Sequence, residues 1–180
     1  MSMSEIKEVK KDMVPVKGLH YRFIPVLTPE KFWNNDMSIE NSQHVELMMV
    51  FKKYGLDWKK IYKTRYWKQR MYWYHVGMKQ WTAKYAVERI VVRYRIFKSI
   101  KKNGFKNKPV KLLKTPIWAS RFGHKGLQGP EIYDGGGRCA AAYVLGIDKV
   151  PAIWCEDRAP GTGDKGKWAK KLKHVNGIWD

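Results

Sequence analysis

The residues with the clearest chemical potential are three glycines that stand between an aspartate and an arginine, Asp134-Gly135-Gly136-Gly137-Arg138. Glycines let the backbone approach a ligand closely and turn its amides inward. A helix that starts directly after them would add unpaired N–H groups and the positive end of its dipole. Arg138 adds a guanidinium that can hold a phosphate through two hydrogen bonds. The turn therefore predicts anion binding, most naturally of a phosphate.

The segments around this turn are predicted to form a helix–strand–turn–helix–strand unit over residues 82–157. The longer helix starts at the capping residue Thr82, and its apolar side chains recur at spacings of three and four. Gly104 and Gly146 are positioned to end the two helices. The predicted helices are 82–103 and 139–145, and the predicted strands are 109–113, 131–134 and 150–155.

Two blocks of residues in this unit follow one another in a recognisable order. The run DGGGRCAAAYVLGIDKVPAIW, residues 134–154, joins Asp-Gly-x-x-Arg to an alanine-rich helix, a Leu-Gly turn and a Val-Pro strand. Upstream, RIFKSIKKNGF at 95–105 and KPVKL at 108–112 contain a Ser-Ile pair, a glycine and a Pro-Val strand. Over about residues 91–156 the chain resembles the ParB/sulfiredoxin superfamily of ParB-like nuclease domains. The resemblance implies an α/β (α+β) core with a small mixed sheet.

The resemblance also implies a phosphate- or nucleotide-binding site at the glycine turn. Ser99 matches the family's Ser-Ile element, and the cations on or near the preceding helix are candidates to add charge to the site: Arg93, Arg95 and Lys98. Asp134 could bind Mg²⁺ or Mn²⁺ or act as a base, or it could simply cap the turn. Glu30, far upstream, is a more distant candidate base.

The chain departs from two branches of that superfamily. Sulfiredoxins carry a reactive cysteine where Gly137 stands here, and we expect Cys139 to be a buried, inert thiol inside the helix. Partitioning ParB proteins have two arginines in the turn and a helix-turn-helix domain downstream, whereas this chain has one arginine and about 25 further residues. The resemblance is therefore limited to the small core of the superfamily. In other members this core serves as a DNA nuclease, a nucleotide-dependent phosphotransferase or a nucleotide-binding (NTPase) unit.

A basic, aromatic segment at residues 42–81 is predicted to be helical. Between Lys52 and Arg70 it holds eight basic residues against the single Asp57. Four residues at helical spacing are predicted to form one buried face: Trp58, Ile61, Tyr62 and Tyr66. The cations then face outward as candidates to contact a nucleic-acid backbone, or form an ordinary solvated face: Lys52, Lys53, Lys59, Lys60, Lys63 and Arg70. Aromatic rings left exposed could stack on unpaired bases.

Charge dominates the composition. The 180-residue chain has 36 Lys and Arg against 16 Asp and Glu, a formal net charge of +20. A basic body of this size favours a polyanionic partner, most commonly nucleic acid, with an anionic membrane surface or mere solubility as the rivals. No apolar run is long enough to span a bilayer. Two cysteines, which follow no metal spacing and cannot form a disulfide framework, favour a reducing, cytoplasmic setting. The five histidines are scattered, which argues against a dedicated zinc site.

Five regions are expected along the chain: a flexible basic arm at 1–18, a strand and turn at 19–41, the helical segment at 42–81, the core at 82–157 and a basic tail at 158–180. Three functions remain open: a DNA-binding, ParB-like nuclease that needs a metal ion, a phosphotransferase or nucleotide-binding unit that takes a nucleoside triphosphate, and a non-catalytic nucleic-acid-binding module. The net charge favours the first and third. The scarcity of paired carboxylates favours binding over cleavage.

Overall fold

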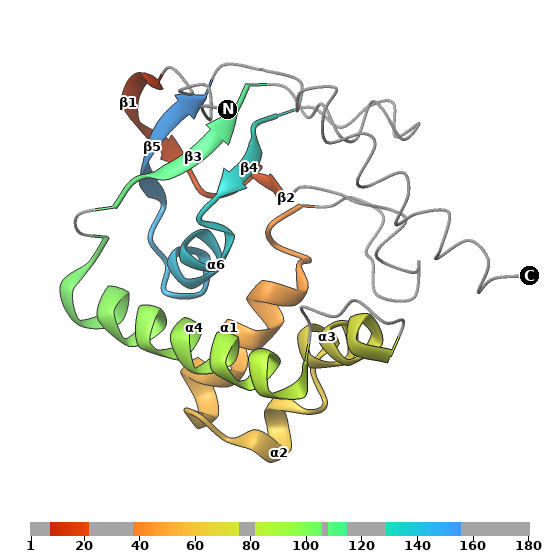
Figure 1. The fold of residues 1–180 in the computed structure, drawn as a ribbon. Helices are drawn as coiled ribbons and strands as arrows, with labels where there is room; N and C mark the ends of the chain where they lie inside the picture. Colours follow the sequence, from red (N-terminus) through yellow and green to blue (C-terminus); the bar gives the residue numbers. More distant parts are fainter. Residues whose placement is uncertain (1–7, 22–37, 76–81, 106–107, 115–128, 156–180) are drawn as a thin grey trace, which may run out of the picture.

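The computed structural model describes residues 8–21, 38–75, 82–105, 108–114 and 129–155, which form a mixed α+β fold (Figure 1). Within this part, a five-stranded sheet has the order β1-β5-β3-β4-β2. β1 pairs with β5 and β3 with β4 in antiparallel fashion, whereas β3–β5 and β2–β4 are parallel. The strands are β1 Glu8–Pro15, β2 His20–Tyr21, β3 Val110–Leu113, β4 Glu131–Asp134 and β5 Lys149–Cys155. The predicted small mixed sheet is confirmed.

The described helices begin and end largely where the capping residues predict. They are α1 Gln43–Tyr54, α2 Trp58–Ile61, α3 Arg65–His75, α4 Ala83–Asn103 and α6 Gly136–Val144. The Thr82 hydroxyl accepts a hydrogen bond from the Tyr85 amide at 3.0 Å and so caps α4. Gly104 ends the same helix with φ of 68°. None of these described helices combines the length and hydropathy that crossing a membrane requires.

Helix α6 lies at the centre of the fold, between the sheet on one side and helices α1 and α4 on the other (Figure 1). Its residues Cys139, Ala140, Ala141 and Ala142 are fully buried. A helix surrounded on all sides must be apolar all round, and alanine side chains allow the neighbouring elements to approach closely. This packing holds the N-terminus of α6 in place directly after β4.

The basic segment differs from the prediction because its second helix is interrupted. The sequence predicts one helix from Asp57 toward Gly77, whereas α2 ends at Ile61 and α3 starts at Arg65. Thr64 lies at the break: its hydroxyl donates to the Ile61 carbonyl at 2.6 Å and accepts from the Trp67 amide at 3.2 Å. Such local bonds compete with a continuous helix and cap a new one.

The break changes which aromatic side chains reach the core. Ile61 and Tyr66 are buried, as predicted, and Trp58 is partly buried against the core. Tyr62 no longer shares a continuous helical face with Tyr66 and is 47% exposed. The prediction that Tyr62 belongs to the core is therefore wrong.

The expected flexible arm at residues 1–18 is also corrected, over residues 8–15. Residues 8–15 form β1, an edge strand that pairs with β5. Val14 and Val16 are buried while Met13 and Pro15 are exposed, which is the alternation of a half-buried strand. Pro15 stands at the end of this edge strand, a position where its missing N–H is tolerated. Residues 1–7, most of the expected 19–41 unit and the 158–180 tail lie outside the described residues.

Candidate functional site

The glycine turn lies where β4 ends and α6 begins, in the strand–turn–helix arrangement that the sequence predicts. Gly135 has φ of 97°, a left-handed conformation that other residues rarely adopt. The amides of Arg138 and Cys139 donate to the Gly135 carbonyl at 2.8 and 3.0 Å and close the first helical turn. The amides of Gly136 and Gly137 fall within that first turn, where a helix supplies no acceptor. They are therefore suited to bind an anion.

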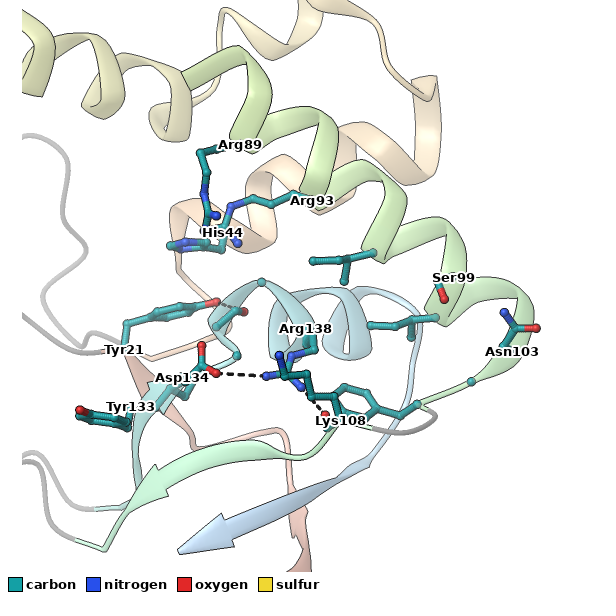
Figure 2. A pocket seen from close by; sticks show the side chains of 18 residues that line it. Tyr21, His44, Arg89, Arg93, Ser99, Asn103, Lys108, Tyr133, Asp134 and Arg138 are labelled. Carbon is teal, nitrogen blue, oxygen red and sulfur yellow. Dashed lines mark hydrogen bonds and ion pairs between the residues drawn. The ribbon is translucent and has the colours of Figure 1, made fainter. Parts of the chain in front are cut away.

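A pocket of about 800 Å³ opens at this turn, between α4 and the end of β4 (Figure 2). The three turn glycines line it, together with apolar side chains that include Ile96 and Phe105. Its charged side chains and its one histidine are Arg89, Arg93, Lys108, Arg138, Asp134 and His44. Four cations thus face one carboxylate among the described lining residues. A concave site with this imbalance attracts anions.

Arg93 packs directly on the glycine turn. Its Nε donates to the Tyr66 hydroxyl at 2.6 Å, and its guanidinium lies 5.2 Å from the centre of the Tyr66 ring. A Cβ atom placed on Gly137 would lie only 2.2 Å from Nη1 of Arg93. Figure 2 shows Arg89 and Arg93 both reaching from α4 toward the turn and His44. The absent side chain at position 137 therefore makes room for a cation at the start of α6.

Arg138 ties the turn to the segment that precedes β3. Its Nη1 donates to the carbonyls of Lys108 and of Pro109, the latter at 3.0 Å. Its Nη2 pairs with Oδ2 of Asp134 at 3.4 Å, as Figure 2 shows. For Arg138 to bind a phosphate through two hydrogen bonds, as expected from the sequence, these bonds would have to rearrange. In this arrangement Arg138 supplies charge to the pocket while holding its wall.

Within the described part of the chain, Asp134 does not have the surroundings of a metal ligand. Its side chain is 60% exposed, and its ion-pair partner is Arg138. Among the described residues no group of three or more His, Cys, Asp or Glu could hold a metal ion. A single carboxylate beside a guanidinium does not fit Mg²⁺ or Mn²⁺, which take several oxygen ligands. Glu30, the other candidate acid or base, lies outside the described residues.

A stack of aromatic rings forms another wall of the pocket. The Tyr21 hydroxyl donates to the Gly136 carbonyl at 2.5 Å, and the Tyr21 ring stacks on His44 at 4.5 Å. His44 meets the edge of Tyr66 at 5.1 Å. Burial, followed by the charges of Arg93 and Arg70, holds the pKa of His44 well below its usual value. This histidine is therefore neutral, and its buried Nδ1 has no hydrogen-bond partner among the described residues.

The α4 residues that line the pocket are only partly those expected. Ser99 lines it, whereas Arg95 and Lys98 are exposed and do not. Arg89 and Arg93 line it instead. At 100° per residue, positions 89 and 93 lie 40° apart on the helix, while 95 and 98 lie on the opposite side. This helical periodicity could have predicted from the sequence that Arg93 lies on a different side of the helix from Arg95 and Lys98. Nothing comparable in the sequence marks His44 as a pocket residue.

The lysines of the basic segment are exposed, as predicted: Lys52, Lys53, Lys59, Lys60 and Lys63. Lys52 Nζ donates to the Val144 carbonyl at 2.8 Å, at the end of α6 remote from the glycine turn. Lys52 therefore lies away from the turn, and none of these five lysines is among the residues that line the pocket.

Arg70, predicted to face outward with them, is buried at 6% exposure, and that prediction is wrong. Its guanidinium lies 4.7 Å from the Tyr66 ring and 4.3 Å from the Trp73 ring. Burial lowers its pKa to about 10, which leaves it cationic at neutral pH. The physical reason is the break before α3, which turns position 70 toward the core side of that helix.

Cys139 is fully buried, and burial raises the pKa of its thiol to about 12. The expected burial of this thiol is confirmed, and because the nucleophilic form is the thiolate, low reactivity stays the prediction.

Comparisons with protein-family models, with curated proteins and with solved structures found no match to this chain. The resemblance of residues 91–156 to the ParB/sulfiredoxin superfamily stays a prediction from the sequence.

Proposed function

We propose that this protein binds nucleic acid, with DNA as the expected partner, and that the pocket at the start of α6 holds one of its phosphate groups. One observation carries the proposal: Gly136 and Gly137, in the first turn of α6, line the same pocket as Arg89 and Arg93. Helix N-termini with free amides are ready anion sites, and guanidinium groups add charge-assisted hydrogen bonds to phosphate oxygens.

The whole chain favours a polymeric anion over a small one. A net charge of +20 exceeds what one phosphate in a pocket can balance. The exposed lysines of the basic segment provide a second basic surface outside the pocket, and one of them, Lys52, contacts the far end of α6. α6 has nine residues and is about 13 Å long, a separation that a few nucleotides of a strand can bridge. One nucleic-acid strand could therefore contact both surfaces.

The apolar side of the pocket supports a second candidate, a bound nucleotide. Ile96, Ile100, Phe105 and Ile132 line the pocket together with the cations. A volume of about 800 Å³ lies within the range of small-molecule sites, which combine apolar walls with a few polar groups. A nucleotide would place its phosphate at the glycine turn and its base against this wall. DNA cleavage, by contrast, stays a prediction of the resemblance.

The test compares two arginines of α4 that are both exposed and differ in position. Arg89 lines the pocket, whereas Arg95 does not. Arg89→Gln and Arg95→Gln each remove one charge, and binding of labelled DNA is measured by fluorescence anisotropy across a salt series. Loss of a charged hydrogen bond of about 1.5–3 kcal/mol predicts roughly 10- to 150-fold weaker binding for Arg89→Gln and little change for Arg95→Gln.

Two results would contradict the proposal. Equal effects of the two substitutions would mean that only the overall charge matters and that the pocket is not the phosphate site. Affinity that does not fall with rising salt would exclude binding through phosphates altogether. Displacement of DNA by a nucleoside triphosphate, lost in Arg89→Gln, would favour the nucleotide candidate for the pocket.

A further inference from the structure

Tyr62 forms an exposed aromatic surface that the core does not use. Its ring is 47% exposed, yet it is supported by two indoles, with ring centres 4.7 Å away at Trp67 and 5.8 Å away at Trp58. Both tryptophans are partly buried and pack against the hydrophobic core. The two indoles therefore restrict the motion of the Tyr62 ring. A ring already held in this way loses little conformational entropy when a ligand stacks on it.

Positive charge surrounds this ring along the chain. Lys59 and Lys63 are exposed and lie three residues before and one residue after Tyr62. Asp57 is the single acidic residue of the segment from Lys52 to Arg70, and one of its carboxylate oxygens accepts the Lys60 amide at 3.3 Å as the cap of α2. The surface thus combines an apolar ring with uncompensated cations.

We propose that Tyr62, held by Trp58 and Trp67, is a stacking platform for an unpaired base of single-stranded nucleic acid, with Lys59 and Lys63 contacting the flanking phosphates. Aromatic rings interleaved with lysines match a single strand, because its bases expose their faces and its phosphates follow at regular intervals. A duplex would meet the lysines but would keep its bases stacked internally. The proposal rests on the proposed function. It specifies single-stranded nucleic acid as the ligand of a second surface, outside the pocket.

The experiment compares Tyr62→Ala with Tyr74→Ala. Tyr74 is also 47% exposed and lies in the same basic segment, but among the described residues the ring against it is that of His75, at 5.4 Å, and not an indole. The probes are a labelled oligo-dT of about 12 nucleotides and a duplex of equal phosphate number, with oligo-U as the RNA arm. We expect Tyr62→Ala to bind the single strands roughly 5- to 150-fold more weakly and the duplex as the unaltered protein does. Tyr74→Ala should bind all probes normally.

Two further variants separate stacking from packing. Tyr62→Trp keeps an aromatic face and should retain single-strand affinity. Tyr62→Leu keeps an apolar contact for the two indoles but removes the flat ring, so it should lose affinity even if Tyr62→Ala fails to fold. Melting temperatures show which variants are folded.

The outcomes distinguish this inference from the proposed function. If Tyr62→Leu binds oligo-dT like the unaltered protein, or loses single-strand and duplex binding equally, the platform is refuted while the pocket stands. If anionic lipid vesicles, and not oligonucleotides, bind in a Tyr62-dependent way, the partner is wrong. If the unaltered protein binds no oligonucleotide at low salt, both proposals fall.

Discussion

Replacing Gly137 by alanine tests the pocket geometry at its tightest point. The added Cβ would lie 2.2 Å from Arg93 Nη1, whereas ordinary contact begins at 3.4 Å. The guanidinium must therefore retreat by about 1.2 Å. It cannot do so freely, because its Nε is bonded to the Tyr66 hydroxyl at 2.6 Å. We expect Gly137→Ala to displace Arg93 from the turn and to break or lengthen that bond.

The substitution should weaken binding more than it weakens the fold. Alanine favours the helix by about 1 kcal/mol over glycine, and the lost hydrogen bond from the charged Arg93 guanidinium to Tyr66 costs about 1.5–3 kcal/mol. The free energy of unfolding should therefore fall by about 0.5–2 kcal/mol. The displaced guanidinium no longer reaches a bound phosphate, which predicts roughly 10- to 150-fold weaker binding of DNA.

The assay is a double-mutant cycle with Arg93→Gln, read by DNA-binding anisotropy and by urea unfolding. If Gly137→Ala acts through Arg93, the double variant should bind no more weakly than Arg93→Gln alone. Additive losses would show that the alanine methyl group blocks the ligand directly or that Arg93 has no part in binding. Unchanged binding by Gly137→Ala would refute the placement of phosphate at this turn.

Two further predictions concern buried titrating groups. Burial, followed by the charges of Arg93 and Arg70, holds the pKa of His44 well below its usual value. The unfolded chain therefore binds a proton near pH 6.5 that the folded chain does not bind. As the pH decreases from about 6.5, the free energy of unfolding should decrease by up to about 1.4 kcal/mol per pH unit. Urea unfolding at pH 7 and pH 5 should show this loss reduced in His44→Phe, which keeps a ring against Tyr21; the same pH dependence in both proteins would contradict it. Cys139, whose thiol pKa is raised to about 12, should resist a thiol reagent at pH 8 until urea unfolds the chain, and prompt modification of a folded Cys155→Ser variant would contradict its burial.

The strand, turn and helix at the candidate site could be predicted because their signals are local. Three glycines, an alanine run and Gly146 specify the turn, the buried helix and its end within about a dozen residues. The periodicity of the longest helix likewise fixed its limits, since Thr82 and Gly104 cap it as expected. Each of these features depends on side chains close in sequence.

The remaining features depend on contacts between distant segments, or on a competition between two local preferences. Thr64 reads equally well as a helical residue or as a cap, and only the structure shows that it ends one helix and starts the next. That single choice buries Arg70 and exposes Tyr62, which reverses both predictions. β1 carries lysines and a proline, and its pairing with β5 joins segments more than 130 residues apart. No local pattern specifies such a partner.

The way in which Arg93 is held strengthens the case for an anionic ligand. Arg93 is positioned by a hydroxyl and a ring, both from Tyr66, and no carboxylate among the described residues pairs with it. Burial alone would raise the pKa of Tyr66, but Arg93 and Arg70 outweigh it and lower that pKa, a measure of how strong the local positive potential is. A carboxylate partner would have fixed the guanidinium equally well and cancelled its charge. A phenol fixes it and leaves the charge available, which is the arrangement that a binding site for phosphate requires.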